Sequence, residues 1–272
     1  MIFLDWNMGW GASIDRAIQG INNIIGKNDF VITLQEIGEV KSRALFDAFG
    51  TDCNISYSMN YRPRGKREPR NRDLGIMIIT SKDIEIVDSE VLSNALLPER
   101  SLFVKLKYED KIFTVLSLHS ITGCDHRRAK SLQFYAFADA IDKYQPDIVS
   151  FDANEPEIDA PTIEEMKFFD NKDGGMGANE FFVSLRDNGL SDAFLSVFDG
   201  KYEKGTPLAV SHVVNRKGPA RYDFIFANKT MVLIENVEYK LEEALKASGD
   251  HAFVIMVSDG TLWEVQTALY FR

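Results

Sequence analysis

The sequence is poor in cysteine, and this excludes several classes of protein. Its two cysteines, Cys53 and Cys124, are too few for a disulfide framework or a structural zinc site, and they form no Cys-x-x-Cys pair. We expect both to be reduced thiols in a cytoplasmic protein. The chain does not need disulfides, because 272 residues with 45% hydrophobic side chains can bury a large core.

Long apolar segments are also missing. The longest apolar run, Ala252 to Val257, has the length of a β-strand and is too short to span a membrane. The first residues, Met-Ile-Phe-Leu-Asp-Trp-Asn, contain neither a basic region nor a long apolar stretch. We therefore expect no signal peptide and no membrane partner.

Positive charge is scarce. The chain has 31 Lys and Arg residues against 41 Asp and Glu residues, which gives a formal net charge of −10. This argues against a protein that coats nucleic acid through bulk charge, but it does not exclude an enzyme that handles phosphate through metal ions and a few local cations. Repeats, low-complexity tracts and Pro/Gly/Ser-rich linkers are absent too, so we expect a single domain over residues 1–272.

Short apolar runs alternate with helical patterns along the chain. Ser13 is an expected N-cap of the first helix, and Gly26 is placed to end it. Strands outnumber helices, which favours an α/β sandwich of mixed sheets over a doubly wound parallel fold. The expected strands are 2–6, 30–34, 54–61, 74–80, 84–92, 102–108, 112–118, 147–151, 222–227, 232–239 and 252–257, and the expected helices are 14–25, 40–49, 127–143 and 241–247.

Polar side chains lie at or near one end of six of these strands. An acid at such a place is more often a turn residue or a helix cap than a catalytic group. Six such places on one rigid scaffold can nevertheless converge on a single cleft. The candidate residues are Asn7, Glu36, His119, Asp152, Asn154, Asp223, Asp250 and His251.

The motifs around these residues resemble, in order, those of the endonuclease/exonuclease/phosphatase superfamily, which contains deoxyribonuclease I and the abasic-site endonucleases. The resemblance implies a four-layer α/β sandwich of two packed mixed β-sheets flanked by helices. Two departures flank reactive residues without replacing them, Phe151 for the usual Gly and Phe253 for a common Pro. The motifs are Leu4-Asp5-Trp6-Asn7, Leu34-Gln35-Glu36, Leu118-His119-Ser120, Phe151-Asp152-Ala153-Asn154, Arg221-Tyr222-Asp223-Phe224-Ile225 and Gly249-Asp250-His251-Ala252.

The resemblance implies a metal-dependent phosphodiesterase that hydrolyses nucleic acid by in-line attack of an activated water. Oxygen ligands suit Mg²⁺ or Mn²⁺, either of which neutralises charge on the phosphate. Glu36 is the expected main ligand, and Asn7 and Asp250 are expected to support the same ion. Glu36 also fits an acid at a helix N-terminus, because a helix is expected from Val40 onwards.

The resemblance also implies catalytic roles. His251 would activate water or hold the phosphate, with Asp223 fixing its tautomer. Asp152 competes with it as the general base, and the sequence leaves this choice open. Asn154 and His119 would donate to phosphate oxygens, or His119 would protonate the leaving group.

Two further features of the resemblance concern acids. In the deoxyribonuclease I branch an acid pairs with the first histidine of the site, and such an acid is expected for His119 near residues 71–73 but is not identified there. Asp192 also resembles a family position. Its structural interpretation, as a loop or cap residue, keeps it out of the catalytic set.

Residues 62–72 form one concentrated basic run with six cations and one acid. Two prolines and a glycine make it a loop, and its arginines match phosphate oxygens well, although a solvated loop fits the pattern equally. Tyr61 beside it fits either base stacking or a strand end. The candidate phosphate-binding residues are Arg64, Arg67, Arg70, Arg72 and Arg127.

The expected partner is therefore nucleic acid, with DNA favoured over RNA, and no obligate protein partner is implied. One rival is a phosphatase or phosphodiesterase of a small-molecule or lipid phosphoester. The other is a binding module without catalysis on the same fold. The motif at His119 and the basic run favour the nuclease, and the retained polar residues argue against the inactive module.

Overall fold

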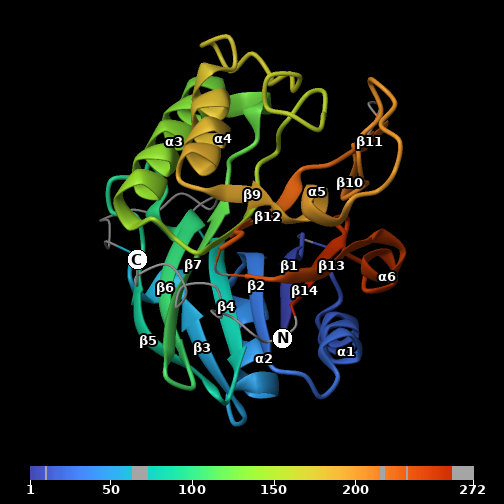
Figure 1. Cartoon of the computed structure of the whole chain (residues 1–272). Helices are drawn as coiled ribbons and strands as arrows, with labels where there is room; N and C mark the ends of the chain where they lie inside the picture. Colours follow the sequence, from blue (N-terminus) through green and yellow to red (C-terminus); the bar gives the residue numbers. More distant parts are fainter. Residues whose placement is uncertain (10, 63–72, 215–217, 231, 259–272) are drawn as a thin grey trace, which may run out of the picture.

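Two six-stranded β-sheets pack face to face in the computed structural model of the chain (Figure 1). The structure describes residues 1–9, 11–62, 73–214, 218–230 and 232–258, with side chains except at residues 123–125. Helices cover the outer face of each sheet, so the layers run helix, sheet, sheet, helix. The expected four-layer α/β sandwich with two mixed sheets is thereby confirmed.

The first sheet has the strand order β13-β14-β1-β2-β4-β3. β1 and β2 pair in parallel, and the other neighbours pair antiparallel. Three helices, α1 (Ile14–Ile25), α2 (Glu39–Phe49) and α6 (Leu241–Lys246), bury apolar side chains against its outer face. The strands are β1 (Ile2–Asn7), β2 (Phe30–Ile37), β3 (Cys53–Tyr57), β4 (Gly75–Ser81), β13 (Ile234–Lys240) and β14 (Phe253–Ser258).

The second sheet has the strand order β5-β6-β7-β8-β12-β9, with β7 and β8 parallel. Helices α3 (Gly123–Tyr144) and α4 (Met176–Asp187) lie side by side on its outer face (Figure 1). The short α5 (Ala193–Val197) follows β9. The strands are β5 (Ile84–Glu90), β6 (Ser101–Tyr108), β7 (Lys111–His119), β8 (Ile148–Asp152), β9 (Leu190–Asp192) and β12 (Asp223–Asn228), and a separate ribbon pairs β10 (His212–Val214) with β11 (Gly218–Ala220).

Several expected boundaries are wrong for local reasons. The expected strand 54–61 ends at Tyr57, and Ser58–Asn60 forms a turn of 3₁₀ helix. The Ser58 hydroxyl donates to the Glu99 carbonyl and accepts from the Ile76 amide, which turns the chain away from the sheet. α3 starts before the expected residue 127, but its backbone leaves helical geometry at His126.

Other outcomes concern isolated features. Ser13 precedes α1 as expected, but its side chain makes no capping hydrogen bond. Cys53 is a free thiol. In the part of the chain that the structure describes, no helix is long and apolar enough to cross a membrane.

The side chains that face the space between the two sheets change from apolar at one end of the central strands to polar at the other end. On β1, Leu4 and Trp6 face the helices, so Phe3, Asp5 and Asn7 face the second sheet. The other central strands follow the same rule, and the polar residues fall at one edge of the sandwich. The inward-facing series are Phe3-Asp5-Asn7, Val31-Thr33-Gln35, Val115-Ser117-His119 and Ile148-Ser150-Asp152.

A hydrogen-bonded polar layer separates the apolar core from this edge. The Thr33 hydroxyl and the Gln35 amide each donate to Oδ1 of Asp5 at 2.6 Å, and the Ser150 hydroxyl donates to Thr33 at 2.8 Å. Burial raises the pKa of Asp5 to about 7 although these hydrogen bonds oppose the rise. Asp5 Oδ2 has no hydrogen-bond partner among the described residues. The layer links both sheets directly below the polar edge.

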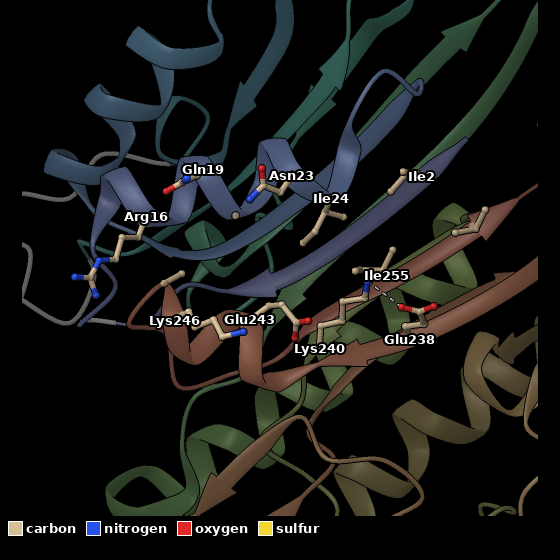
Figure 2. Close-up of a pocket in the computed structure, with 13 residues that line it drawn as sticks. Ile2, Arg16, Gln19, Asn23, Ile24, Glu238, Lys240, Glu243, Lys246 and Ile255 are labelled. Atoms are coloured by element: carbon tan, nitrogen blue, oxygen red, sulfur yellow. Dashed lines mark ion pairs between the residues drawn. The ribbon is translucent and has the colours of Figure 1, made fainter.

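A groove of about 580 Å³ lies on the outer face of the first sheet, between α1 and strands β13 and β14 (Figure 2). Ile24 and Ile255 contribute apolar walls, and Lys240 pairs with Glu238 at 3.0 Å on the rim. Among the residues that the structure describes, the groove is lined by none of the expected site residues. Its position separates it from the polar edge described next.

Phe151 explains one departure from the family motif. Its side chain is 1% exposed and lies among the rings of Phe181, Phe182, Phe224 and Phe226, with centroid distances between 5.0 and 5.8 Å. The ring fills the space between β8, β12 and α4, where a glycine would leave a cavity. The surrounding aromatic cluster therefore accommodates a large ring at this position.

Replacing Phe151 by Ala is expected to lower the free energy of unfolding by about 3–5 kcal/mol, because it removes a buried ring and leaves a cavity. Chemical denaturation followed by circular dichroism measures this change. Leu132→Ala, at a position 62% exposed on α3, is the control and should change stability by less than about 0.5 kcal/mol. A loss below about 1 kcal/mol for Phe151→Ala would contradict the assigned packing.

Candidate active site

Strand register brings the candidate residues to one edge of the sandwich. The parallel pair β7–β8 sets His119 opposite Asp152, and the antiparallel pair β8–β12 sets Asp152 opposite Asp223. Asn7 ends β1, and His251 lies two residues before β14, which runs antiparallel to β1. Because parallel strands end where antiparallel neighbours begin, all of these side chains gather at the polar edge.

Asp152 lies at the centre of this group. It is 1% exposed, and the Asn7 amide donates to its Oδ2 at 2.8 Å. The backbone N–H of Asn154 donates to Oδ1 at 2.8 Å, and the Asn154 amide donates to Oδ2 at 3.2 Å. Oδ2 also lies 3.6 Å from Nε2 of His119 and 4.0 Å from Nε2 of His251. The carboxylate is thus held in one orientation, facing both histidines.

His251 and Asp223 form the pair that the family resemblance implies. Nδ1 of His251 lies 2.8 Å and 3.1 Å from the two carboxylate oxygens of Asp223. Burial acts to lower the pKa of His251, but the carboxylates of Asp223 and Asp152 raise it to about 10. The two carboxylates thus favour the protonated form of the ring. Its backbone is fixed by Trp6, whose indole N–H donates to the His251 carbonyl at 3.0 Å.

His119 has a different partner from the expected acid. Nη1 of Arg100 lies 3.3 Å from each ring nitrogen, while Asp73, in the segment where an acid was expected, is exposed. Burial and the positive charges of Arg100 and His251 hold the pKa of His119 well below its usual value. His119 is therefore a neutral imidazole beside a buried guanidinium. Arg100 comes from the 3₁₀ turn Pro98–Arg100 before β6, where no sequence pattern pointed to it.

Glu36 is aimed into the site by a bulge in β2. The pairing of β2 with β4 shifts register between Leu34 and Ile37, and Glu36 has a φ of 59°. Bulges re-aim side chains in this way beside functional sites. The alternative interpretation, an acid at a helix N-terminus, is wrong because α2 begins at Glu39. Glu36 instead lies 3.7 Å from His119, and burial followed by repulsion from Asp152 raises its pKa.

Glu36 and Asp250 share a positively charged neighbour. The Lys41 ammonium donates to the Gly9 carbonyl, lies 3.5 Å from the Glu36 carbonyl, and is attracted by the carboxylates of Glu36 and Asp250. Asp250 approaches Gly9 so closely that a Cβ there would overlap its Oδ1. The Asn7 Oδ1 accepts from the Gly9 amide at 2.9 Å. Lys41 was not expected from the sequence.

The donor set fits a hard divalent cation. Asn7 and Asp250 place amide and carboxylate oxygens at Gly9, and the carboxylates of Glu36 and Asp250 both attract Lys41. Such oxygens are the ligands that Mg²⁺ and Mn²⁺ prefer. Burial makes negative charge at Glu36 costly, and a cation would offset that cost. The neighbouring group Asp152, Asp223 and His251 also brings potential ligand atoms within 4.8 Å of one another.

Solved structures with this architecture are numerous. The 3′ phosphatase NExo from Neisseria, bound to a product DNA hairpin, aligns with a TM-score of 0.65 at 17% identity, over 95% of this chain and 99% of that one. An AP endonuclease from Archaeoglobus fulgidus aligns with the same TM-score of 0.65 at 14% identity, over 95% and 99%. D. rerio TDP2 with a single-strand DNA product aligns at 0.62 and 12% identity, over 94% and 97%.

The fold is that of the deoxyribonuclease I-like superfamily. No family model and no curated protein matches the sequence itself. The six motifs that carried the resemblance therefore lie on the fold that they implied. At these identities the comparison concerns the deoxyribonuclease I-like fold, and the chemistry has to be argued from the side chains.

A buried ion pair fixes the position of the loop that follows β8. Lys130 of α3 and Glu155 are 1% and 0% exposed and lie 2.9 Å apart. Lys130 also donates to the Asn154 carbonyl at 2.6 Å, and the Asn171 amide donates to Glu155 at 2.9 Å. Asn154 adopts a φ of 49°, so its backbone depends on these contacts.

Asn154 is engaged differently from the expected role. Its amide donates to Asp152 at 3.2 Å and to the Ser120 carbonyl at 3.3 Å, so in this structure it orients Asp152. The expected donation to a phosphate oxygen stays a prediction.

Asp192 has the structural role that its interpretation as a cap residue implies. Its side chain accepts from the amides of Phe194 and Leu195 at the start of α5. Its Oδ2 also lies 2.7 Å from Nη2 of Arg221, whose Nε is 3.1 Å from Asp159. Arg221 thus anchors the start of β12, just ahead of Asp223.

The candidate phosphate-binding residues are only partly placed. Arg64, Arg67, Arg70 and Arg72 lie outside the described residues. Arg127 is exposed on α3. Tyr61 follows the 3₁₀ turn and is 44% exposed, so its interpretation as a strand residue inside the core is wrong.

Replacing Lys130 by Met is expected to lower the free energy of unfolding by about 3–5 kcal/mol, because it leaves the Glu155 carboxylate buried without its cation. Lys167→Met provides the control, since Lys167 and Glu157 form an ion pair with side chains 62% and 40% exposed. That variant should lose less than about 1 kcal/mol. Urea denaturation measures the free energy of unfolding of both variants. Equal losses in the two variants would contradict the stabilising role assigned to the buried pair of Lys130 and Glu155.

Proposed function

We propose that this protein is a metal-dependent hydrolase of nucleic-acid phosphodiesters that acts by in-line attack of an activated water. The observation that carries the proposal is the convergence of Asp152, the pair His251–Asp223 and His119 beside the oxygen donors around Glu36. These groups supply a base, a cationic donor and a metal site within one rim. Phosphoester hydrolysis needs those three elements together.

The metal would be held by Glu36, with Asn7 and Asp250 in support. When bound, Mg²⁺ or Mn²⁺ would supply charge neutralisation at the reacting phosphate. Lys41 would complement this charge from α2, since its ammonium is attracted by both Glu36 and Asp250.

Asp152 is assigned to orient and deprotonate the attacking water. Its two oxygens are fixed by Asn7 and Asn154, and it faces both histidines. His251 is assigned to hold a phosphate oxygen, because its Nδ1 is engaged by Asp223 and its Nε2 is the nitrogen on the Asp152 side. Of the two candidates that the sequence left open, we accordingly propose Asp152 as the general base.

We assign His119 and Arg100 to stabilise the negative charge that develops at the reacting phosphate during hydrolysis. His119 is a neutral ring that lies 3.7 Å from Glu36 and 3.6 Å from Asp152. Arg100 lies behind it and carries a fixed positive charge into a buried site, where electrostatic stabilisation is stronger than in water. This pair takes the place of the histidine and acid of the deoxyribonuclease I branch.

Nucleic acid is the proposed substrate, and DNA is favoured. The neighbouring structures of NExo and TDP2 contain product DNA, which supports this choice for this chain. A cavity of about 390 Å³ borders Glu36, with Leu74 and Val40 as apolar walls and Lys41 as a cation. It offers space for the nucleoside next to the reacting phosphate. The proposal keeps Arg64, Arg67, Arg70, Arg72 and Arg127 as phosphate contacts, and a cytoplasmic location.

The direct test is hydrolysis of supercoiled plasmid, linear duplex and single-stranded DNA with Mg²⁺, Mn²⁺ or chelator. We expect cleavage with either metal and none with chelator. The rate in His251→Ala should be reduced by a factor of at least about 100. Glu36→Gln should raise the Mg²⁺ concentration at half-maximal rate. His126→Ala, at an exposed position on α3, is the matched histidine control. Wild-type rates in His251→Ala, or no cleavage of any DNA by the wild type, would refute the proposal.

A second test separates nucleic acid from small phosphoesters. Replacing Arg64, Arg67, Arg70 and Arg72 together by Ala should weaken DNA binding and flatten its dependence on salt concentration, because fewer counterions are released. The charge-matched control replaces four exposed lysines outside the polar edge, Lys27, Lys82, Lys107 and Lys229. Fluorescence anisotropy across a salt series measures both. An unchanged salt slope in the arginine variant would favour the small-phosphoester rival.

A further inference from the structure

A second histidine lies directly against the ring of His251. The ribbon β10–β11 is attached to the start of β14 by a bridge between His212 and His251 and by a hydrogen bond from the Ala252 amide to the Ser211 carbonyl. Residues paired across such a bridge carry their side chains side by side. The two imidazole rings accordingly lie 4.3 Å apart, with an angle of 23° between their planes.

Both rings have Nδ1 engaged, which leaves Nε2 as the available nitrogen. Nδ1 of His212 donates to the Asp250 carbonyl at 2.8 Å, and Nδ1 of His251 lies 2.8 Å from Asp223. A backbone carbonyl or a carboxylate on the second nitrogen is the arrangement that orients histidines toward metal ions. The carboxylate of Asp250 lies close to both rings, because one of its oxygens and one nitrogen of each ring lie within 4.8 Å of one another.

We propose that Nε2 of His212, Nε2 of His251 and the carboxylate of Asp250 form a binding site for a transition-metal ion of the Zn²⁺ class. Two imidazoles and one carboxylate suit Zn²⁺, Co²⁺ or Ni²⁺, whereas Mg²⁺ prefers an all-oxygen set. The site is therefore chemically distinct from the oxygen donors around Glu36, although Asp250 belongs to both. This proposal concerns binding and holds whether or not the chain hydrolyses DNA.

The surroundings favour a cation at this place. The carboxyl groups of Asp152 and Asp223 lie 4.0 Å from Nε2 and 2.8 Å from Nδ1 of His251, so acidic groups flank the ring on both sides and would attract a metal ion bound to it. The other potential set, Asp152 with Asp223 and His251, is less available. The Asp152 oxygens already accept from Asn7 and Asn154, and the Asp223 oxygens face Nδ1 of His251.

Binding requires a limited rearrangement. Ligand atoms in a tetrahedral zinc site are about 3.3 Å apart, given bonds of roughly 2.0 Å, so the three groups must close in and the stacked rings must tilt apart. His212 is half-buried on a two-stranded ribbon and Asp250 is exposed, so these two side chains supply the movement. The contact between Nδ1 of His251 and the Asp223 carboxylate would be kept.

One consequence rests on the proposed function. An ion on Nε2 of His251 would occupy the nitrogen assigned to the phosphate and would draw Asp250 away from Glu36. Zn²⁺ should therefore inhibit Mg²⁺-dependent hydrolysis through His212. The ribbon would thereby make the active site sensitive to transition metals.

The experiment is calorimetric titration of ZnCl₂ into the whole chain without Mg²⁺, because Mg²⁺ in the oxygen-rich site would compete for Asp250. We expect one Zn²⁺ to bind per chain. The affinity for Zn²⁺ should fall by a factor of at least about ten in His212→Ala and should be unchanged in His126→Ala. Co²⁺ serves as a spectroscopic probe, and its visible absorption bands should appear with the wild type and be lost in His212→Ala. Circular dichroism of the variant verifies that it is folded.

The outcomes are separable from those of the hydrolysis test, because binding is measured without substrate. No Zn²⁺ binding by the wild type, or equal affinity in His212→Ala, would overturn the site. If hydrolysis is present, Zn²⁺ should inhibit the wild type at concentrations about tenfold below those needed for His212→Ala. Equal inhibition of both would place the inhibitory ion elsewhere.

Discussion

The hydrogen-bond register of β7, β8 and β12 is the constraint on which the rest of the structure depends. It sets His119, Asp152 and Asp223 on adjacent strands at one level. A slip by one residue in any of these strands would turn its side chain from the site to the outer face. The outward residues prevent such a slip, because Phe151 and Phe224 are locked into the aromatic cluster under α4. Packing on one face thus fixes chemistry on the other.

The polar edge carries a cost in stability that buried pairs offset. Asp5, Asp152, Asp223 and His251 are all removed from solvent, and a buried charge is tolerated only when other groups satisfy it. The structure surrounds the site with such partners. Arg221 ties β12 to acidic side chains of neighbouring segments, and the polar layer around Asp5 joins the two sheets. Organisation of the site and stability of the sandwich are therefore coupled through shared residues.

Most strands and the catalytic candidates could be predicted from the sequence, because each is encoded locally. An apolar run that ends in a polar residue, as at Leu118-His119 or Phe151-Asp152, is visible in a few letters. Arg100 and His212 could not be found this way, since only tertiary contacts bring them to the histidines. The segment 153–221 was also missed, including α4 and the ribbon. The bulge at Glu36 depends on pairing with β4, which no local pattern reveals.

The two ends of β1 face opposite ways, and this has a practical consequence. Asn7 reaches the active-site edge, whereas the Met1 ammonium donates to the Ser258 carbonyl at the other end. The strand between them has 6 residues and spans roughly 17 Å, at about 3.3 Å per residue. A surface linkage at the Met1 end of this strand would therefore leave the polar edge facing the solution. Single-molecule tethers and affinity supports attached at that end would not cover the polar edge.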